Sequence, residues 1–472
     1  MILATVAASA QTTLRKSVTW QNIQAHPAPL PVSGELIPIK SNLDAASFWS
    51  VGSETLDRDF ADFEKYKEFM GETGVGYSRL QSGWAKTEQK KGKYDFSWID
   101  AHVDGLIAQG IHPWICLCYG NPVYSDHGYD LNAKLFPDGP IMDGWLKYVR
   151  ACVKRYKGKV TMWEVWNEPD GGKNKESYPL YANLFVRTAK VIREVDPQAK
   201  IAAFGACSPD REYIRKGMEL IKEAGGLPYV DYITYHGYWS TPELIIPAVK
   251  KLRADMDAYS PSIGLLQGET GCPAQLEYGH AMNSIEWTEY SQAKWDLRQA
   301  LTQFGLGIPY SFFTMVDLNY GWMLQSYGLI RLNGVKAPVY KRPKFYAVQH
   351  VTSLFTPDMK SVEGVQVAGP ANTQITSFGL EKAGKKVGCM LWLSATRPSS
   401  SLERHLMDID ITGLDLKDPV YVDMLTGLVH EIKGLILYNK GGKLGMKDLP
   451  VWDCPVVIME RSAVPFKAVA DK

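Results

Sequence analysis

The chain has 472 residues, of which 45% are hydrophobic and 22% are charged. Lysine and arginine number 52 against 51 aspartate and glutamate, so the net charge of +1 argues against binding to nucleic acid or to anionic membranes by bulk charge. No apolar run reaches the roughly 18 residues of a membrane span. The length suits two or three domains, and 14 tryptophans and 25 tyrosines suit a large core or a surface that stacks on flat, weakly polar ligands.

The first residues, MILATVAASA, are apolar and small, and residues 8–10 have the small-x-small form of a signal cleavage site. No basic residue precedes this run. We therefore expect residues 1–12 to be a truncated signal segment and the protein to be exported, with a plain N-terminal arm on a cytoplasmic protein as the alternative. The seven cysteines are odd in number and scattered, which predicts buried thiols rather than a disulfide framework.

Short apolar runs alternate with stretches of helical periodicity along the first part of the chain. The apolar runs cover residues 47–52, 75–80, 112–119, 160–166, 201–205, 230–236, 262–267 and 308–316. The helical stretches cover residues 59–72, 98–108, 144–156, 181–195, 211–224, 242–259 and 287–304. Eight such units within about 300 residues fit a (β/α)8 barrel better than an open, doubly wound sheet, which would usually carry a glycine-rich phosphate loop after its first strand.

After about residue 345 the helical periodicity fades, and short alternating runs punctuated by Gly, Pro, Asn and Asp follow. This pattern is typical of an antiparallel β-sandwich. We predict an α/β fold, with a TIM barrel over residues 46–345 and a C-terminal antiparallel β-sandwich over residues 346–472. Residues 13–45 are rich in proline, and we expect an extended arm there that joins the sandwich.

Two of the predicted barrel strands end in a glutamate. Glu168 follows the fourth strand and precedes Pro169, which has no amide hydrogen for the sheet, and Glu269 lies between glycines at the end of the seventh strand. Catalytic groups of such barrels lie at the carboxyl ends of the strands, and strands four and seven face each other across the mouth. The two acids can therefore converge on one bond, an arrangement that suits glycoside hydrolysis.

The string WNEP at residues 166–169, followed by Glu269, resembles the retaining glycoside hydrolases of clan A. Within that clan the chain is most similar to family 39, the β-xylosidase and α-L-iduronidase group. The string HGY at residues 236–238 and the barrel-plus-sandwich layout are part of the same resemblance. The resemblance implies an enzyme that cleaves oligo- or polysaccharides by double displacement, as a β-xylosidase or a related exo-glycosidase does.

The resemblance also implies roles for individual residues. Glu168 would be the general acid/base and Glu269 the nucleophile, while Asn167 would bind the sugar 2-hydroxyl and Arg79 would keep the nucleophile ionised. The candidate substrate-binding side chains lie at predicted strand ends or in the loops beyond them, and they are Arg79, Trp84, Asn167, His236, Tyr238 and Trp322. Each has a structural alternative: a turn for Asn167, an ion pair with Glu164 for Arg79, and core packing for the remaining four.

Two other functions stay open at this point. One is a catalytically silent barrel that binds glycans, and the other is a metal-dependent hydrolase, which the absence of His-x-His and His-Glu-x-x-His disfavours. We expect a carbohydrate substrate, with no cofactor, metal, nucleic acid partner or membrane span. The sequence leaves open the oligomeric state and the sugar, which could be xylose, galactose, glucose, arabinose or a uronic acid. An additional Arg or Lys at the pocket would indicate the uronic acid.

Overall fold

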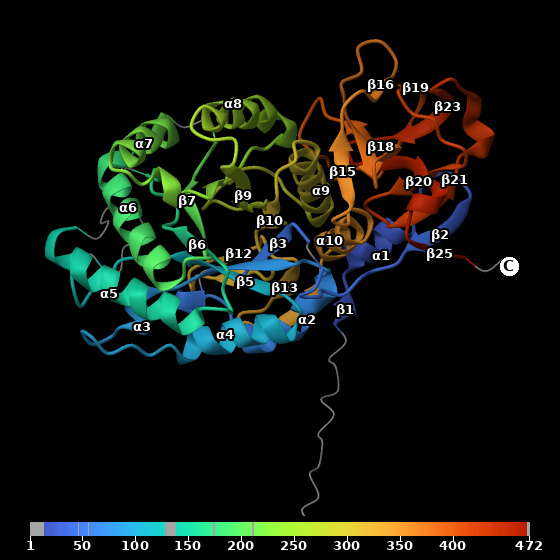
Figure 1. Cartoon of the computed structure of the whole chain (residues 1–472). Helices are drawn as coiled ribbons and strands as arrows, with labels where there is room; N and C mark the ends of the chain where they lie inside the picture. The colour runs from blue at the N-terminus through green and yellow to red at the C-terminus, as the bar shows by residue number, and fades with distance from the viewer. Residues whose placement is uncertain are drawn as a thin grey trace, which may run out of the picture.

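The computed structural model describes residues 14–469 except residues 46, 55, 127, 129–137, 173–174 and 210–211. The expected signal segment, residues 1–12, lies outside the described residues. Figure 1 shows a barrel surrounded by helices, with a group of β-sheets from the C-terminal part of the chain packed against one side.

Parallel strands close into a barrel in the order β10-β3-β4-β5-β6-β7-β8-β9. Their bounds are β3 (Trp49–Gly52), β4 (Tyr77–Gln81), β5 (His112–Leu117), β6 (Met162–Val165), β7 (Lys200–Ala206), β8 (Tyr232–Tyr235), β9 (Gly264–Thr270) and β10 (Tyr310–Phe312). Each strand overlaps one of the predicted apolar runs, so the TIM barrel predicted from periodicity is confirmed.

Helices cover the outside of the barrel. The longer ones are α4 (Ser97–Ala108), α5 (Gly139–Tyr156), α6 (Tyr178–Val195), α7 (Glu212–Glu223), α8 (Ile246–Asp257), α9 (Glu289–Gly305) and α10 (Pro343–Leu354). The helix expected over residues 59–72 is instead broken into short turns around α2 (Lys67–Met70), because Tyr66 leaves the helical region with φ −128° and ψ −5°. The short helix α3 (Trp84–Thr87) follows β4.

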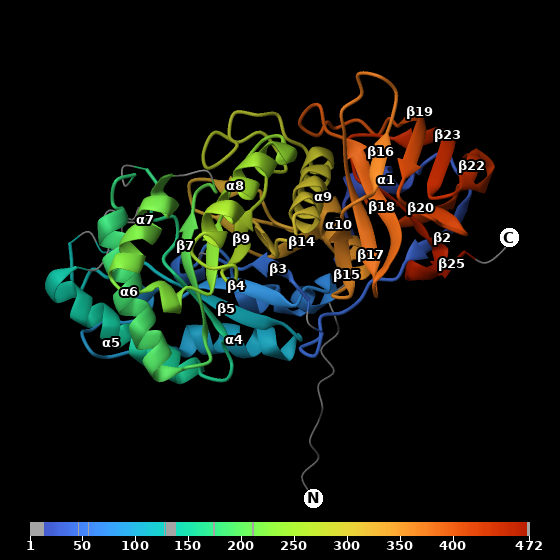
Figure 2. The same cartoon turned by 45° about the horizontal axis from the view of Figure 1, so that its top comes forward.

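Beyond α10 the chain forms two antiparallel sheets, with the orders β15-β17-β18-β24-β20-β21-β2-β25 and β16-β19-β23-β22. The first sheet contains β2 (Val32–Leu36), β15 (Met359–Val362), β17 (Ile375–Lys382), β18 (Lys385–Leu393), β20 (Pro419–Asp423), β21 (Leu428–Glu431), β24 (Val456–Glu460) and β25 (Phe466–Ala468). The second contains β16 (Gln366–Ala368), β19 (His405–Thr412), β22 (Ile436–Lys440) and β23 (Lys443–Val451). Helix α9 lies between the barrel and these sheets (Figure 2), and residues 291–304 of it are therefore buried.

Two sequence expectations about the domain borders need correction. The predicted boundary between the barrel and the sandwich, after residue 345, falls inside α10. This helix packs against α9 and is the last helix of the barrel layer. The arm over residues 13–45 is not extended throughout, since α1 (Val18–Gln24) is helical before β2 begins. Ser17 caps this helix by accepting from the Trp20 amide, and the Trp20 ring stacks on Tyr346 of α10 at 4.1 Å between ring centres.

Short strands complete the structure near the barrel mouth. They are β1 (Arg15–Lys16), β13 (Ile330–Leu332) and β14 (Pro338–Lys341) in one sheet, and the hairpin of β11 (Leu318–Asn319) and β12 (Leu324–Gln325). The seven cysteines are free thiols, and all except Cys207 are buried. Within the described part of the chain, no helix combines the length and the apolar character needed to cross a bilayer.

Candidate active site

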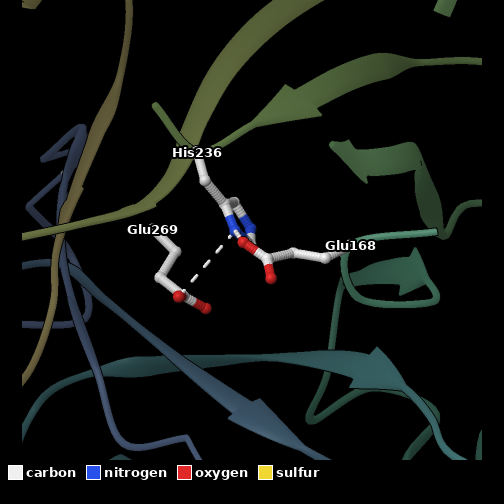
Figure 3. A group of neighbouring side chains, drawn as sticks. All are labelled: Glu168, His236 and Glu269. Atoms are coloured by element: carbon white, nitrogen blue, oxygen red, sulfur yellow. Dashed lines mark hydrogen bonds and ion pairs between the residues drawn. The ribbon is translucent and has the colours of Figure 1, made fainter. Parts of the chain in front are cut away.

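The two glutamates predicted to be catalytic meet at the carboxyl ends of opposite barrel strands. Glu269 belongs to β9, and Glu168 follows β6, where its amide donates to the Gly205 carbonyl at 2.9 Å and so fixes the turn. A carboxylate oxygen of Glu168 lies within 4.8 Å of one of Glu269. Figure 3 shows the two side chains facing each other beside His236. This short separation is close to the 5–5.5 Å or so between carboxyl groups in retaining glycosidases, and well below the roughly 6.5–9.5 Å of inverting ones.

Both oxygens of Glu269 accept hydrogen bonds from fixed donors. The Tyr238 hydroxyl donates to Oε1 at 2.6 Å, and Arg79 Nη1 donates to Oε2 at 2.7 Å. The Glu269 side chain is only 10% exposed. Two hydrogen bonds, one of them from a cation, hold the Glu269 carboxylate in one orientation. A nucleophile needs such a fixed orientation.

Glu168 is paired with a buried histidine. His236 Nδ1 lies 2.9 Å from Glu168 Oε1 and 3.8 Å from Glu269 Oε1. Burial by itself would lower the pKa of His236, but the negative charges of Glu269 and Glu168 outweigh it and raise that pKa. Burial acts to raise the pKa of Glu168, and the hydrogen bond and charge of His236 reverse the effect and lower it. The pair therefore stores one proton beside the nucleophile.

Arg79, at the centre of β4, connects the two sides of this site. Its fully buried guanidinium donates to Glu164 at 2.8 and 2.5 Å and to Asn167 Oδ1 at 2.8 Å, in addition to Glu269. Glu164 also accepts from the Thr234 hydroxyl at 2.5 Å. Glu164 is thus a structural acid that fixes Arg79, and Arg79 in turn orients Asn167 and the nucleophile. The side-chain nitrogen of Asn167 takes no part in these contacts.

Comparison with known proteins agrees with this geometry. Residues 75–257 match the family model "Glycosyl hydrolases family 39", a segment that contains Arg79, Glu168 and His236 and ends before Glu269. Residues 75–257 are thus similar to the glycosyl hydrolases of family 39. A solved family 39 glycoside hydrolase from Bacteroides cellulosilyticus superposes with a TM-score of 0.63 and 17% identity, over 90% of this chain and 82% of that one. A monomeric β-xylosidase from Caulobacter crescentus superposes with a TM-score of 0.57 and 17% identity, over 90% and 98%.

One curated relative aligns with less than half of the chain. It is an aryl-phospho-β-D-glucosidase from Bacillus subtilis, 23% identical over 226 residues, which are 44% of this chain and 46% of that protein. The chain thus spans about half the length of this relative. At these identities the solved structures bear on the fold alone, so the roles of individual residues depend on the contacts described above.

A third glutamate of the site was missed in the sequence. Glu54 follows β3, is 1% exposed, and its Oε1 lies 3.3 Å from Arg79 Nη1, the same nitrogen that binds Glu269. Burial raises the pKa of Glu54 to about 8, with the charge of Arg79 lowering it and that of Glu269 raising it. Burial therefore favours the neutral form of the Glu54 carboxyl group. Glu168 and Glu269 were predicted to be catalytic because each lies at the end of a predicted strand. Glu54 meets the same criterion.

Trp84 does not take the substrate-binding position expected for it. The chain turns at Gly83, with φ +51°, and Trp84 begins α3 with its ring fully buried. The indole stacks on Tyr124 at 4.9 Å, contacts Trp145 at 5.5 Å, and donates to a Glu88 oxygen at 2.6 Å. It packs between the barrel and α5, so its structural alternative is correct.

Trp322 lies in the loop between β11 and β12 and is 71% exposed. Its ring stacks on His280 at 5.9 Å and contacts Tyr320 at 6.2 Å. Burial, followed by the charges of Glu269 and other nearby acids, raises the pKa of Tyr320, so this aromatic cluster stands within electrostatic reach of the nucleophile. The exposed face of Trp322 is thus available at the rim of the mouth.

The same residues could offer ligands to a cation. Glu168, His236 and Glu269 each supply one ligand atom, and these atoms lie within 4.8 Å of one another. However, Arg79 lies 2.7 Å from Glu269, and its fixed positive charge opposes a second cation at that carboxylate. The hydrogen-bonding pattern is better matched to proton transfer than to metal binding.

Proposed function

We propose that the chain is a retaining exo-glycosidase of the β-xylosidase type, acting on oligosaccharides through a covalent glycosyl-enzyme. The observation that supports it is the separation of less than 4.8 Å between oxygens of Glu168 and Glu269, with Glu269 held by Tyr238 and Arg79. This spacing leaves no room for the water molecule that an inverting enzyme places between base and sugar.

In the first step, Glu269 attacks the anomeric carbon while Glu168 gives its proton to the leaving oxygen. The bond from the carbon to that oxygen breaks, and an ester bond to Glu269 forms. The proton comes from the Glu168–His236 pair, which shares it across 2.9 Å. Because a bound sugar excludes water, the negative charge on Glu168 becomes more costly there, which favours transfer of the proton from His236 to Glu168 before the bond breaks.

In the second step, the ionised Glu168 removes a proton from water, and the water oxygen attacks the anomeric carbon. The ester bond to Glu269 breaks and the carboxylate is regenerated, so the sugar leaves with its original configuration. Asn167 would hold the 2-hydroxyl through both steps, because Arg79 already fixes its Oδ1.

The test is turnover of a series of nitrophenyl glycosides, with NMR of the first anomer released. We expect Glu269→Gln to abolish turnover. We expect Glu168→Ala to retain it only for leaving groups that need no protonation. The exposed Glu403→Gln is the control and should behave as wild type. Release of the inverted anomer, or wild-type rates in Glu269→Gln, would refute the proposed mechanism.

A further inference from the structure

The β8–α8 loop, residues 236–245, carries two side chains of the active site, His236 and Tyr238. The chain turns at Gly237, whose φ of +99° suits glycine, and Thr270 of β9 donates its hydroxyl to the Gly237 carbonyl at 3.0 Å. The next residue, Tyr238, donates its own hydroxyl to Glu269 Oε1 at 2.6 Å. The direction of this hydrogen bond therefore depends on how the remainder of the loop is held.

Helix α9 holds the outer side of the β8–α8 loop at two points. Trp295 Nε1 donates to the Trp239 carbonyl oxygen at 2.9 Å. One turn further along α9, Arg298 donates to Glu243 through Nε at 2.7 Å and through Nη2 at 2.5 Å. Glu243 lies in the turn η5 (Pro242–Ile245), which ends the loop. Both contacts come from one face of α9, because residues three apart in a helix are neighbours on its surface.

The sandwich contacts the second of these points directly. Trp392 of β18 donates from its indole Nε1 to Glu243 Oε1 at 2.5 Å, and Arg298 Nη1 donates to the Thr396 carbonyl at 2.9 Å. Glu243 is 8% exposed, and Arg298 and Trp392 are fully buried. These contacts are possible because α9 lies between the barrel and the sheets (Figure 2). The Glu243 carboxylate thus joins the sandwich to the loop that carries Tyr238.

The hydrogen bonds of Glu243 fix its orientation more than they stabilise the fold. Buried charges lose their water, so a pair such as Glu243 and Arg298 often stabilises a protein no more than apolar residues of the same volume. A bidentate contact and a third donor, however, leave the carboxylate one orientation. Only residues 239–242 separate Glu243 from Tyr238, and Pro242 restricts the backbone of this segment. A position fixed at Glu243 is therefore passed on to Tyr238.

We propose that Trp392 is a positioning residue for the nucleophile: through Glu243 it fixes the β8–α8 loop so that the Tyr238 hydroxyl points at Glu269. This inference rests on the proposed function, in which Glu269 attacks the sugar. It gives the sandwich a part in catalysis, because a hydrogen bond from β18 supports the loop that orients the nucleophile. This role requires no contact between the sandwich and the sugar.

The test is a double-mutant cycle of Trp392→Phe and Tyr238→Phe, with kcat/KM measured on the nitrophenyl glycoside that wild type cleaves fastest. Tyr238→Phe should lower kcat/KM about 10- to 100-fold, the usual loss of a hydrogen bond to a charged group. Trp392→Phe removes the N–H donor and should lower kcat/KM about 2- to 10-fold, because it loosens that bond without removing it. In the Tyr238→Phe background, Trp392→Phe should change kcat/KM less than about 2-fold, because the hydroxyl that it positions is absent.

A purely structural role of Trp392 gives a different pattern. Loss of folded enzyme would lower kcat/KM by the same factor in both backgrounds, since the two substitutions would then act independently. Equal factors in the two backgrounds, or wild-type kcat/KM in either single variant, would overturn the inference while leaving the proposed function intact.

The control is Trp452→Phe, the same substitution at another buried tryptophan of the sandwich. Trp452 is 1% exposed, and its Nε1 has no hydrogen-bond partner within the described chain. This variant removes the same atoms from the core and should keep wild-type kcat/KM. If Trp392→Phe does not fold, as judged by its Tm, Trp392→benzothienylalanine replaces it. This change puts sulfur in place of the N–H and keeps the packing, and the same pattern is expected.

If wild type cleaves none of the glycosides, the proposed function fails by itself. The effect of Trp392 on Tyr238 is then decided by crystal structures of wild type and Trp392→Phe. Displacement of the Tyr238 hydroxyl beyond about 3.5 Å from Glu269 in the variant alone would support the inference. A Tyr238–Glu269 hydrogen bond that both structures keep would overturn it.

Discussion

Replacement of Glu54 by glutamine should remove a loss of stability that wild type undergoes as the pH rises from 5 to 8. Glu54 is buried beside Arg79, and its pKa in the folded protein is about 8, against 4.5 for an unperturbed glutamate. Between these pH values the folded protein keeps the proton and the unfolded chain releases it. The contribution of Glu54 to stability is therefore complete below pH 4.5 and is lost as the pH rises to about 8.

The size of the effect follows from the width of that pH window. Within this window, each pH unit lowers the free energy of unfolding of wild type by about 1.4 kcal/mol. Between pH 5 and pH 8 that free energy therefore falls by about 4 kcal/mol relative to Glu54→Gln. With an unfolding entropy of about 2 cal/mol/K per residue, a chain of 472 residues changes its Tm by about 1 °C per kcal/mol. The gap in Tm between the variant and wild type should thus widen by about 4 °C.

Differential scanning calorimetry of both proteins at pH 5, 6, 7 and 8, at one scan rate, measures this gap. All other groups titrate in the same way in both proteins, so their contributions cancel in the difference in Tm. Glu403→Gln, an exposed substitution of the same kind, controls for the change of residue type. A gap that stays constant across the series, or that narrows as the pH rises, would show that Glu54 is already ionised beside Arg79.

Three further predictions concern other parts of the site and the core. Arg79→Lys should lower kcat/KM at least about 100-fold and reduce Tm. One ammonium cannot hold Glu164 and Glu269 at once, and a broken buried ion pair costs about 3–5 kcal/mol of stability. Steady-state kinetics measures the first effect and calorimetry the second. Trp322→Ala should raise KM about 2- to 10-fold with kcat unchanged if the ring stacks on the sugar, and an unchanged KM would argue for plain packing. His102 is buried, and burial lowers its pKa to about 3. As the pH falls from 7 to 5, the unfolded histidine gains a proton and the folded one does not, so the free energy of unfolding of wild type should fall by about 2 kcal/mol relative to His102→Gln. Urea unfolding at both pH values tests this.

The sequence alone did not show that one buried arginine forms hydrogen bonds with several functional residues at once. Arg79 could be named as a partner of the nucleophile only through the family resemblance, and its bonds to Glu164 and Asn167 bring together residues about 85–90 positions apart in the chain. Glu54 lies two residues beyond the predicted run 47–52, which ends where β3 ends, and so it satisfied the criterion of a strand-terminal acid. Trp84 and Trp322 each follow a glycine, and only the tertiary structure shows that the first is a core residue and the second a rim residue.

The barrel could be predicted from the alternation of apolar runs with amphipathic stretches. A buried parallel strand gives a continuous apolar run, and a helix that covers the sheet gives an amphipathic period, so both are visible in the local sequence. The positions of Glu168 and Glu269 followed from the same pattern, because strand ends are local features too. Tertiary structure decided everything that depends on long-range contact: the helical α1, held by a ring stacked on α10, the raised pKa of Glu54, and the hydrogen bond from Arg79 to Glu269. Charge compensation and burial arise only when distant segments meet, and so no local pattern records them.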